Sequence, residues 1–238
     1  MEEEEEDFKK RRIVVPGEIL GDTTQFKPGW GTFVDNNNIV AQIVGLTDLR
    51  NRTIYIVPFS GSYSPKVGDL VIGLVINTSI VSWKLYINCA YGASLHASNV
   101  LNRSFNPLKD DIRKYFDIGD TIFAEIIAYN RTRDPVLSIL GKGLGKLNGG
   151  KLINVVPSKI PRLIGRKGSM INLIKDTLRG SDIVIGKNGK IWIKSRNPKE
   201  VDLFLKIVRK IEKEAHTSGL TDRIKELISV EKPKLRGA

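Results

Sequence analysis

The chain has 238 residues, 41% of them hydrophobic, and a formal net charge of +12 at pH 7. This length suits one large domain or two to three small ones. No apolar run approaches the roughly 20 residues of a membrane helix, so we expect no membrane partner. The single cysteine, Cys89, excludes an internal disulfide framework and a cysteine zinc site, and it predicts a cytoplasmic location.

Charge is distributed unevenly along the chain. Residues 2–7 are six acids, so the remainder of the chain carries +18, and residues 150–217 hold 16 Lys and Arg against 6 Asp and Glu. A basic surface of this size attracts polyanions with a salt-sensitive affinity. A merely soluble basic protein has the same composition, so charge alone does not decide in favour of RNA.

Residues 1–62 are predicted to form a β-rich N-terminal domain, with residues 1–12 flexible. Turn residues such as Lys27-Pro28-Gly29 separate short β-branched runs, which lie at 13–15, 31–34, 39–45 and 53–57. About 50 residues of short strands make a marginal core. We therefore expect this domain to need contacts with a neighbouring domain or a partner protein for its stability.

Residues 63–140 show the pattern of a small Greek-key barrel with five short strands. Residues 65–75 are expected to be a turn feeding the first strand, and the other four strands are expected within 80–87, 93–96, 118–127 and 135–139. Gly-Asp pairs precede the first and fourth strands, and His96 ends the third. This pattern resembles the S1-type OB-fold, which implies binding of single strands on an open sheet face and its rim loops. The chain departs from the S1 pattern at Val81-Ser82-Trp83-Lys84, where a Phe-Gly is usual.

The barrel offers four candidate RNA-binding side chains, with Tyr86 as a further contact: Lys84, His96, Arg131 and Arg133. His96 is equally well explained as a structural histidine with satisfied hydrogen bonds. The two arginines flank a turn, where arginines are often only solvated, and the S1-like module favours their RNA role modestly. Trp83 is predicted to be a core or subunit-contact aromatic.

Residues 141–150 are rich in glycine and lysine and are predicted to be a flexible basic hinge. They are not a phosphate-binding P-loop, because Leu147 stands where the Mg²⁺-binding Ser or Thr of that motif belongs.

Residues 151–238 are organised around Gly165-Arg166-Lys167-Gly168, in which two glycines bracket two cations between helically spaced apolar residues. The glycines would let backbone N–H groups at a helix start approach an anion closely, and the cations suit a phosphate. A helix to about Arg179, a hairpin and a long amphipathic helix from Asn197-Pro198 follow, and Leu220–Val230 is expected to be an extra helix. This order resembles the eukaryotic-type KH domain, whose loop clamps four nucleotides of a single strand.

A second Gly-x-x-Gly, Gly186-Lys187-Asn188-Gly189, lies between two β-branched runs. Asn-Gly is a strong hairpin signal, so we interpret this copy as a β-turn with a solvated lysine.

Groups for catalysis are scarce in the sequence. Two histidines, one cysteine and no clustered acids in an apolar setting leave little for a hydrolytic site. Asp110-Asp111 could bind a metal ion, but an exposed acidic pair of this kind is usually solvated. We expect no enzyme activity, no cofactor and no metal site.

The complete pattern is Val14-Val15-Pro16-Gly17-Glu18, an S1-like barrel, a glycine-rich hinge and a KH-like module. It resembles the S1/KH cap subunits of the archaeal exosome, a family of multidomain α+β proteins. The resemblance implies a non-catalytic subunit, present in three copies on a hexameric ring of RNase PH-like subunits, with a zinc-ribbon protein as the sister cap subunit. N-terminal domains would grip the ring, and the cap would capture single-stranded RNA, including adenine-rich tails, for phosphorolytic 3′-to-5′ degradation.

Two other classes of protein combine the same modules. Transcription elongation and antitermination factors also place an S1-like module ahead of KH modules, but they carry two KH units in tandem. Polyribonucleotide phosphorylases place KH before S1 and need an RNase PH-like domain, and the chain meets neither condition.

Overall fold

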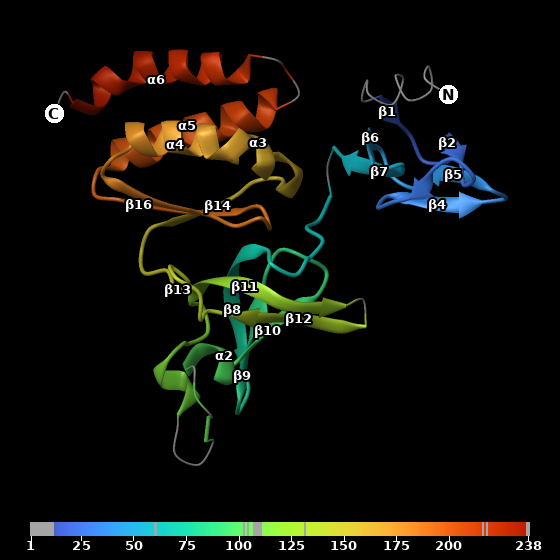
Figure 1. The fold of residues 1–238 in the computed structure, drawn as a ribbon. Helices are drawn as coiled ribbons and strands as arrows, with labels where there is room; N and C mark the ends of the chain where they lie inside the picture. The colour runs from blue at the N-terminus through green and yellow to red at the C-terminus, as the bar shows by residue number, and fades with distance from the viewer. Residues whose placement is uncertain are drawn as a thin grey trace. The chain divides into compact units, whose positions relative to one another are not determined.

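The computed structural model describes residues 12–59, 61–101, 103, 105–106, 111–130, 132–215, 217 and 219–236. The chain divides into two compact units, Met1–Gly61 and Ser62–Ala238, and each is described by itself (Figure 1). Residues 1–12 were expected to be flexible, and of these residues 1–11 lie outside the described part of the chain. No described helix is long and apolar enough to cross a membrane.

The first unit consists of two small, mainly antiparallel sheets. The prediction of a β-rich N-terminal region is confirmed. One sheet has the order β1-β6-β7-β3 and the other β2-β5-β4. The strands are β1 (Ile13–Val14), β2 (Ile19–Asp22), β3 (Lys27–Pro28), β4 (Thr32–Asp35), β5 (Asn38–Ala41), β6 (Gly45–Arg50) and β7 (Thr53–Pro58). The buried core is small, comprising Val14, Leu20, Phe26, Ile39, Ala41, Ile54 and Ile56.

The second unit begins with a closed five-stranded barrel. Its strands follow the order β12-β10-β9-β8-β11, and pairing of β11 with β12 closes the ring. The strands are β8 (Leu70–Thr78), β9 (Ser82–Tyr86), β10 (Gly92–His96), β11 (Thr121–Asn130) and β12 (Arg133–Ser138), with the short helices α2 (Ser98–Leu101) and η1 (Ile112–Lys114) between β10 and β11. The predicted S1-type OB-fold barrel is confirmed.

Trp83 belongs to the barrel core. Its side chain is fully buried, its indole N–H donates to the Phe116 carbonyl at 3.0 Å, and its ring meets the Phe116 ring edge-on at 5.1 Å. A buried indole needs such a partner for its N–H. Of the two roles expected for Trp83, the structure places it in the core.

The glycine-rich segment after the barrel is bonded along its length. Residues Gly145–Lys146 form β13, which pairs with β11, and Lys146 Nζ donates to Asp120 at 2.6 Å. Farther on, the Trp192 indole N–H donates to the Gly149 carbonyl at 2.6 Å. Backbone pairing and a buried tryptophan thus connect residues 145–149 to both modules, and the flexibility expected of residues 141–150 stays a prediction.

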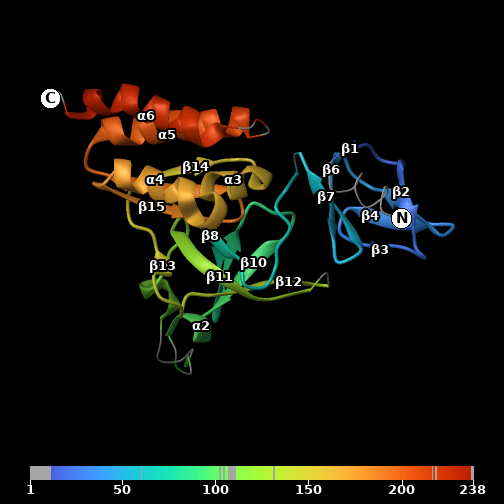
Figure 2. The ribbon, with the colours of Figure 1, turned by 45° about the horizontal axis from the view of Figure 1, so that its top comes forward.

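The KH-like module has a three-stranded antiparallel sheet, in the order β14-β16-β15, covered on one face by helices (Figure 2). The strands are β14 (Lys151–Asn154), β15 (Ser181–Ile185) and β16 (Lys190–Ser195). The helices are η2 (Pro157–Lys159), α3 (Ile160–Ile164), η3 (Arg166–Gly168), α4 (Ser169–Thr177), α5 (Pro198–Glu214) and α6 (Leu220–Arg236). The predicted KH order is confirmed, and the last helix is longer than expected.

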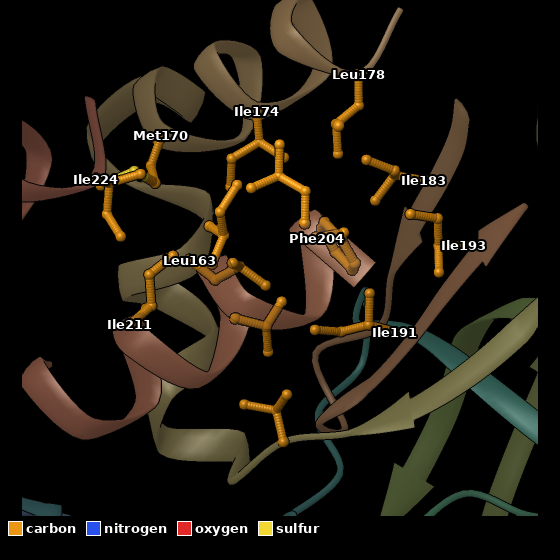
Figure 3. Close-up of a cluster of buried hydrophobic side chains, with 14 of the residues drawn as sticks. Leu163, Met170, Ile174, Leu178, Ile183, Ile191, Ile193, Phe204, Ile211 and Ile224 are labelled. Carbon is orange, nitrogen blue, oxygen red and sulfur yellow. The ribbon is translucent and has the colours of Figure 1, made fainter. Parts of the chain in front are cut away.

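One apolar core holds this module together. Figure 3 shows side chains from the sheet and the helices pointing into a common cluster, including Leu163, Ile174, Ile191, Phe204 and Ile224. Helix α5 begins where expected, because the Asn197 side chain accepts a hydrogen bond from the Lys199 amide at 3.0 Å and Pro198 occupies the first turn. The core fixes both α3 and α4, which flank the first Gly-x-x-Gly.

Candidate nucleic-acid interface

The corner between α3 and α4 depends on its two glycines. Gly165 has φ 77° and ψ 172°, and Gly168 has φ 79° and ψ 11°, both in regions that favour glycine. A Cβ on Gly165 would lie 2.7 Å from the Met170 amide nitrogen, whereas the nearest atom to a Cβ on Gly168 would be 3.7 Å away. At position 165 both the backbone conformation and the close approach of the Met170 amide require glycine. At position 168 only the backbone conformation favours glycine.

The two cations of the corner face solvent. Arg166 and Lys167 are exposed, both glycines are partly accessible, and neither cation forms a salt bridge with any residue in the described part of the chain. Lys167 adopts φ 51° and ψ 29°, a left-handed conformation that costs a non-glycine residue free energy. The corner thus presents two unpaired cations at the start of α4, where amide groups and the helix dipole also favour an anion.

A depression of about 570 Å³ runs between the C-terminal half of α4 and strand β15. Lys175 and Arg179 lie at its rim, while Leu178, Ile183 and Trp192 provide apolar lining. Asp176 and Asp182 also line it, so the charge is mixed. Lys175 lies on α4, whereas Arg179 lies in the turn that follows the helix, so no helical spacing in the sequence indicates that the two cations share this depression.

The outer face of the barrel carries two of the predicted contacts. In the β9–β10 pair, Lys84 lies opposite Ser94 and His96 lies opposite Ser82, and both predicted side chains are exposed. Lys84 Nζ lies 3.8 Å from Asp134 Oδ2, a long and exposed ion pair that contributes little. Lys84 and His96 therefore share one face and remain available to a ligand.

The remaining arginine predictions concern the β11–β12 hairpin. Arg133 is exposed at the start of β12, where it pairs with Asn130. The turn is closed by Thr132, whose amide donates to Asn130 Oδ1 at 3.1 Å. Arg131 lies outside the described residues. The predicted site residues thus form two groups, one on the KH corner and one on the barrel, and their role in RNA binding stays a prediction.

Three family models match successive parts of the chain. The family described as Exosome complex exonuclease RRP4 N-terminal region matches residues 13–48, RRP4, S1 domain matches residues 62–128, and KH domain matches residues 150–199. An Exosome complex component Rrp4 from Thermococcus kodakarensis is 42% identical over 223 residues, which cover 92% of this chain and 86% of that protein. The chain belongs to the Rrp4 family of exosome components. The resemblance inferred from the sequence is confirmed.

Other members of the Rrp4 family match over similar lengths. The Rrp4 of Ignisphaera aggregans is 40% identical over 234 residues, covering 94% of this chain and 92% of that protein. A solved structure named "Crystal structure of putative exosome complex RNA-binding protein" is 37% identical, with a TM-score of 0.67, and covers 73% of this chain and 99% of that chain.

Proposed function

We propose that this chain is the RNA-binding cap subunit of an exosome, which captures single-stranded RNA and passes its 3′ end to a phosphorolytic ring for 3′-to-5′ degradation. Membership in the Rrp4 family supports the exosome assignment. The observation that carries RNA binding is the solvent-facing cationic corner at Arg166 and Lys167, in a KH module that follows an S1-type barrel with its own exposed cations. The transcription-factor alternative is not favoured by these relatives.

A matched pair of substitutions at Gly168 tests RNA binding. The left-handed conformation there is tolerated by Asn and Asp better than by other side chains, and a Cβ at this position would meet no atom closer than 3.7 Å. Gly168→Asp places a carboxylate at the proposed phosphate site and should weaken binding of a labelled single strand about 10-fold or more at low salt. The carboxylate repels the phosphates, and the added side chain keeps them away from the backbone amides. Gly168→Asn is the neutral control and should lose much less.

Both variants should unfold at the same temperature within a few degrees, which thermal unfolding checks. Unchanged RNA affinity of Gly168→Asp, measured by fluorescence anisotropy on the full chain, would contradict a working KH site.

The ring partner is supported by apolar surface on the first unit. In the sheet β2-β5-β4, Ile19 and Phe33 are both exposed and lie opposite Val40 from either side. In the other sheet, Ile13 and Val57 are exposed on either side of Leu46. A small core combined with so much exposed apolar surface is typical of a domain that docks on another protein. We assign this surface to the RNase PH-like ring, with a zinc-ribbon cap subunit as neighbour.

Affinity purification from native extract tests this assembly, because recovery of RNA polymerase in place of ring nuclease subunits would contradict it. We also propose that the chain is not itself an enzyme and that it acts in the cytoplasm. Incubation of the purified chain with labelled RNA and inorganic phosphate should leave the RNA intact, and shortening of the RNA would contradict the first of these statements.

A further inference from the structure

The chain contains two Asn-Gly pairs, Asn148-Gly149 and Asn188-Gly189, and their surroundings differ. In such a pair the backbone nitrogen of the glycine can attack the side-chain carbonyl of the asparagine, because glycine has no side chain to hinder the approach. Asparagine is chemically labile for this reason. The rate of the attack depends on how freely the asparagine side chain and the glycine amide can move.

The second pair is locked into the contact of the second Gly-x-x-Gly turn with the barrel, which we call the seam. Asn188 is fully buried, and its amide nitrogen donates to the Ile72 and Ile87 carbonyls at 2.8 and 2.9 Å, while its oxygen accepts from the Ile72 amide at 3.2 Å. Gly189 is buried too, and its amide donates to the Gly186 carbonyl at 3.3 Å. The attacking nitrogen and its target are therefore both held by hydrogen bonds that must break before they can meet.

The first pair is open to solvent. Asn148 and Gly149 are both exposed, and within the described part of the chain neither the Asn148 side chain nor the Gly149 amide forms a hydrogen bond. A Cβ on Gly149 would meet nothing closer than Lys194 Cε at 3.8 Å, so the space around this glycine is open. The Gly149 carbonyl accepts from the Trp192 indole at 2.6 Å, which leaves the amide on its other side free to react.

We propose that Asn148 is a site of spontaneous deamidation and that the seam protects Asn188 from the same reaction. The Gly149 nitrogen forms a bond to Cγ of Asn148, and the side-chain nitrogen leaves as ammonia together with the proton that Gly149 gives up. Water then opens the resulting succinimide at one of its two carbonyls, which yields aspartate or isoaspartate. The reaction consumes one water and needs no oxidant, reductant or enzyme, and it is independent of the proposed RNA binding.

The isoaspartate product would change the connection between the barrel and the KH module. Its main chain runs through the side-chain carbon, which inserts one methylene between strand β13 and Gly149. Because the Gly149 carbonyl is the acceptor for the buried Trp192 indole, this shift weakens a hydrogen bond that the indole N–H needs. Aspartate at position 148 adds the same negative charge without lengthening the chain.

Ageing of the folded full chain at mildly alkaline pH, below its unfolding temperature, tests the site. Peptide mass spectrometry should show conversion at Asn148 about 10-fold faster, or more, than at Asn188, since the seam hydrogen bonds must first break at Asn188. The rate at Asn148 should rise with pH, because the attacking group is the deprotonated amide. In denaturant both pairs should convert at similar rates. An intact Asn148 in the folded chain would overturn the site, and equal conversion of both pairs there would overturn the protection.

Two variants test the effect on the connection between the modules. Asn148→Gln, aged in parallel, is the control for changes elsewhere in the chain, because its longer side chain would have to close a larger ring and should stay intact. Unaged Asn148→Asp should unfold at the same urea concentration as the unaged parent. The aged parent should unfold at a lower concentration than both Asn148→Asp and aged Asn148→Gln, and equal midpoints would overturn the proposed effect of isoaspartate.

Discussion

Two Gly-x-x-Gly segments in the same module have opposite environments. Residues 165–168 join two helices and expose their middle side chains, whereas residues 186–189 join two strands and are inserted against the barrel, with Asn188 fully buried. Lys187 donates to Asp69 at 2.7 Å, and Asp69 also accepts from the Tyr63 hydroxyl at 2.6 Å. The four-residue pattern does not specify a function, since the flanking elements decide whether it faces a ligand or another module.

The largest expected effect follows substitution of the buried asparagine. Asn188→Asp removes the donor that satisfies the Ile72 and Ile87 carbonyls and places a carboxylate beside them. An unpaired charge in such a site costs about 3 kcal/mol or more of unfolding free energy. Denaturant unfolding of Asn188→Asp should show this loss, while Asn188→Ala should lose less because it buries no charge. Equal stability of Asn188→Asp and the parent would mean that the seam does not contribute to folding.

A smaller effect separates the two glycines of the exposed corner. Gly165→Ala forces a Cβ against the Met170 amide as well as an unfavourable backbone conformation, and it should lower the unfolding free energy by about 2 kcal/mol. Gly168→Ala meets only the conformational cost of about 1 kcal/mol. Parallel urea titrations would measure the difference, and a more destabilised Gly168→Ala would contradict the observed corner geometry.

The smallest expected effects distinguish the two central lysines. Lys167→Gln removes an exposed, unpaired cation from the corner and should reduce the salt slope of RNA binding by about 1 with unchanged stability. Lys187→Gln removes the ion pair with Asp69. Because the Lys187 side chain is 54% exposed, this loss should lower the unfolding free energy by less than about 1 kcal/mol. The RNA affinity of this variant should be unchanged. A reversed outcome for the two variants would exchange the roles assigned to the two turns.

Local patterns account for what was predictable from the sequence. Helical spacing on either side of Gly165 and Gly168, and the Asn-Gly signal at Asn188-Gly189, depend on neighbouring residues, so the corner and the hairpin could both be inferred. The environment of the second turn, at residues 186–189, could not be inferred from local patterns. Lys187 is exposed, as predicted, but its hydrogen bond to Asp69 could not be predicted. Asp69 lies 118 residues away in sequence, and no local pattern encodes such a contact.

The same limit applies to the candidate interface. Lys84 and His96 were predicted from the barrel pattern, and their exposure depends only on strand alternation. Lys190 was not predicted from the sequence, because its position beside Tyr86 arises only when the barrel and the KH module pack together. The contacts of residues 145–149 could not be predicted for a related reason. Glycine content predicts flexibility, but pairing with β11 and the hydrogen bond from Trp192 are contacts with distant elements.

If the barrel face and the Arg166–Lys167 corner both bind RNA as proposed, the buried amide of Asn188, which attaches the KH module to the barrel, also sets the shortest strand that can reach both surfaces. With the spacing between the barrel face and the Arg166–Lys167 corner held constant, only a single strand with enough nucleotides can occupy both at once. Shorter tails would then contact only one surface and would dissociate sooner, because no second contact tethers them. The protein would then sort RNA ends by length without recognising any base.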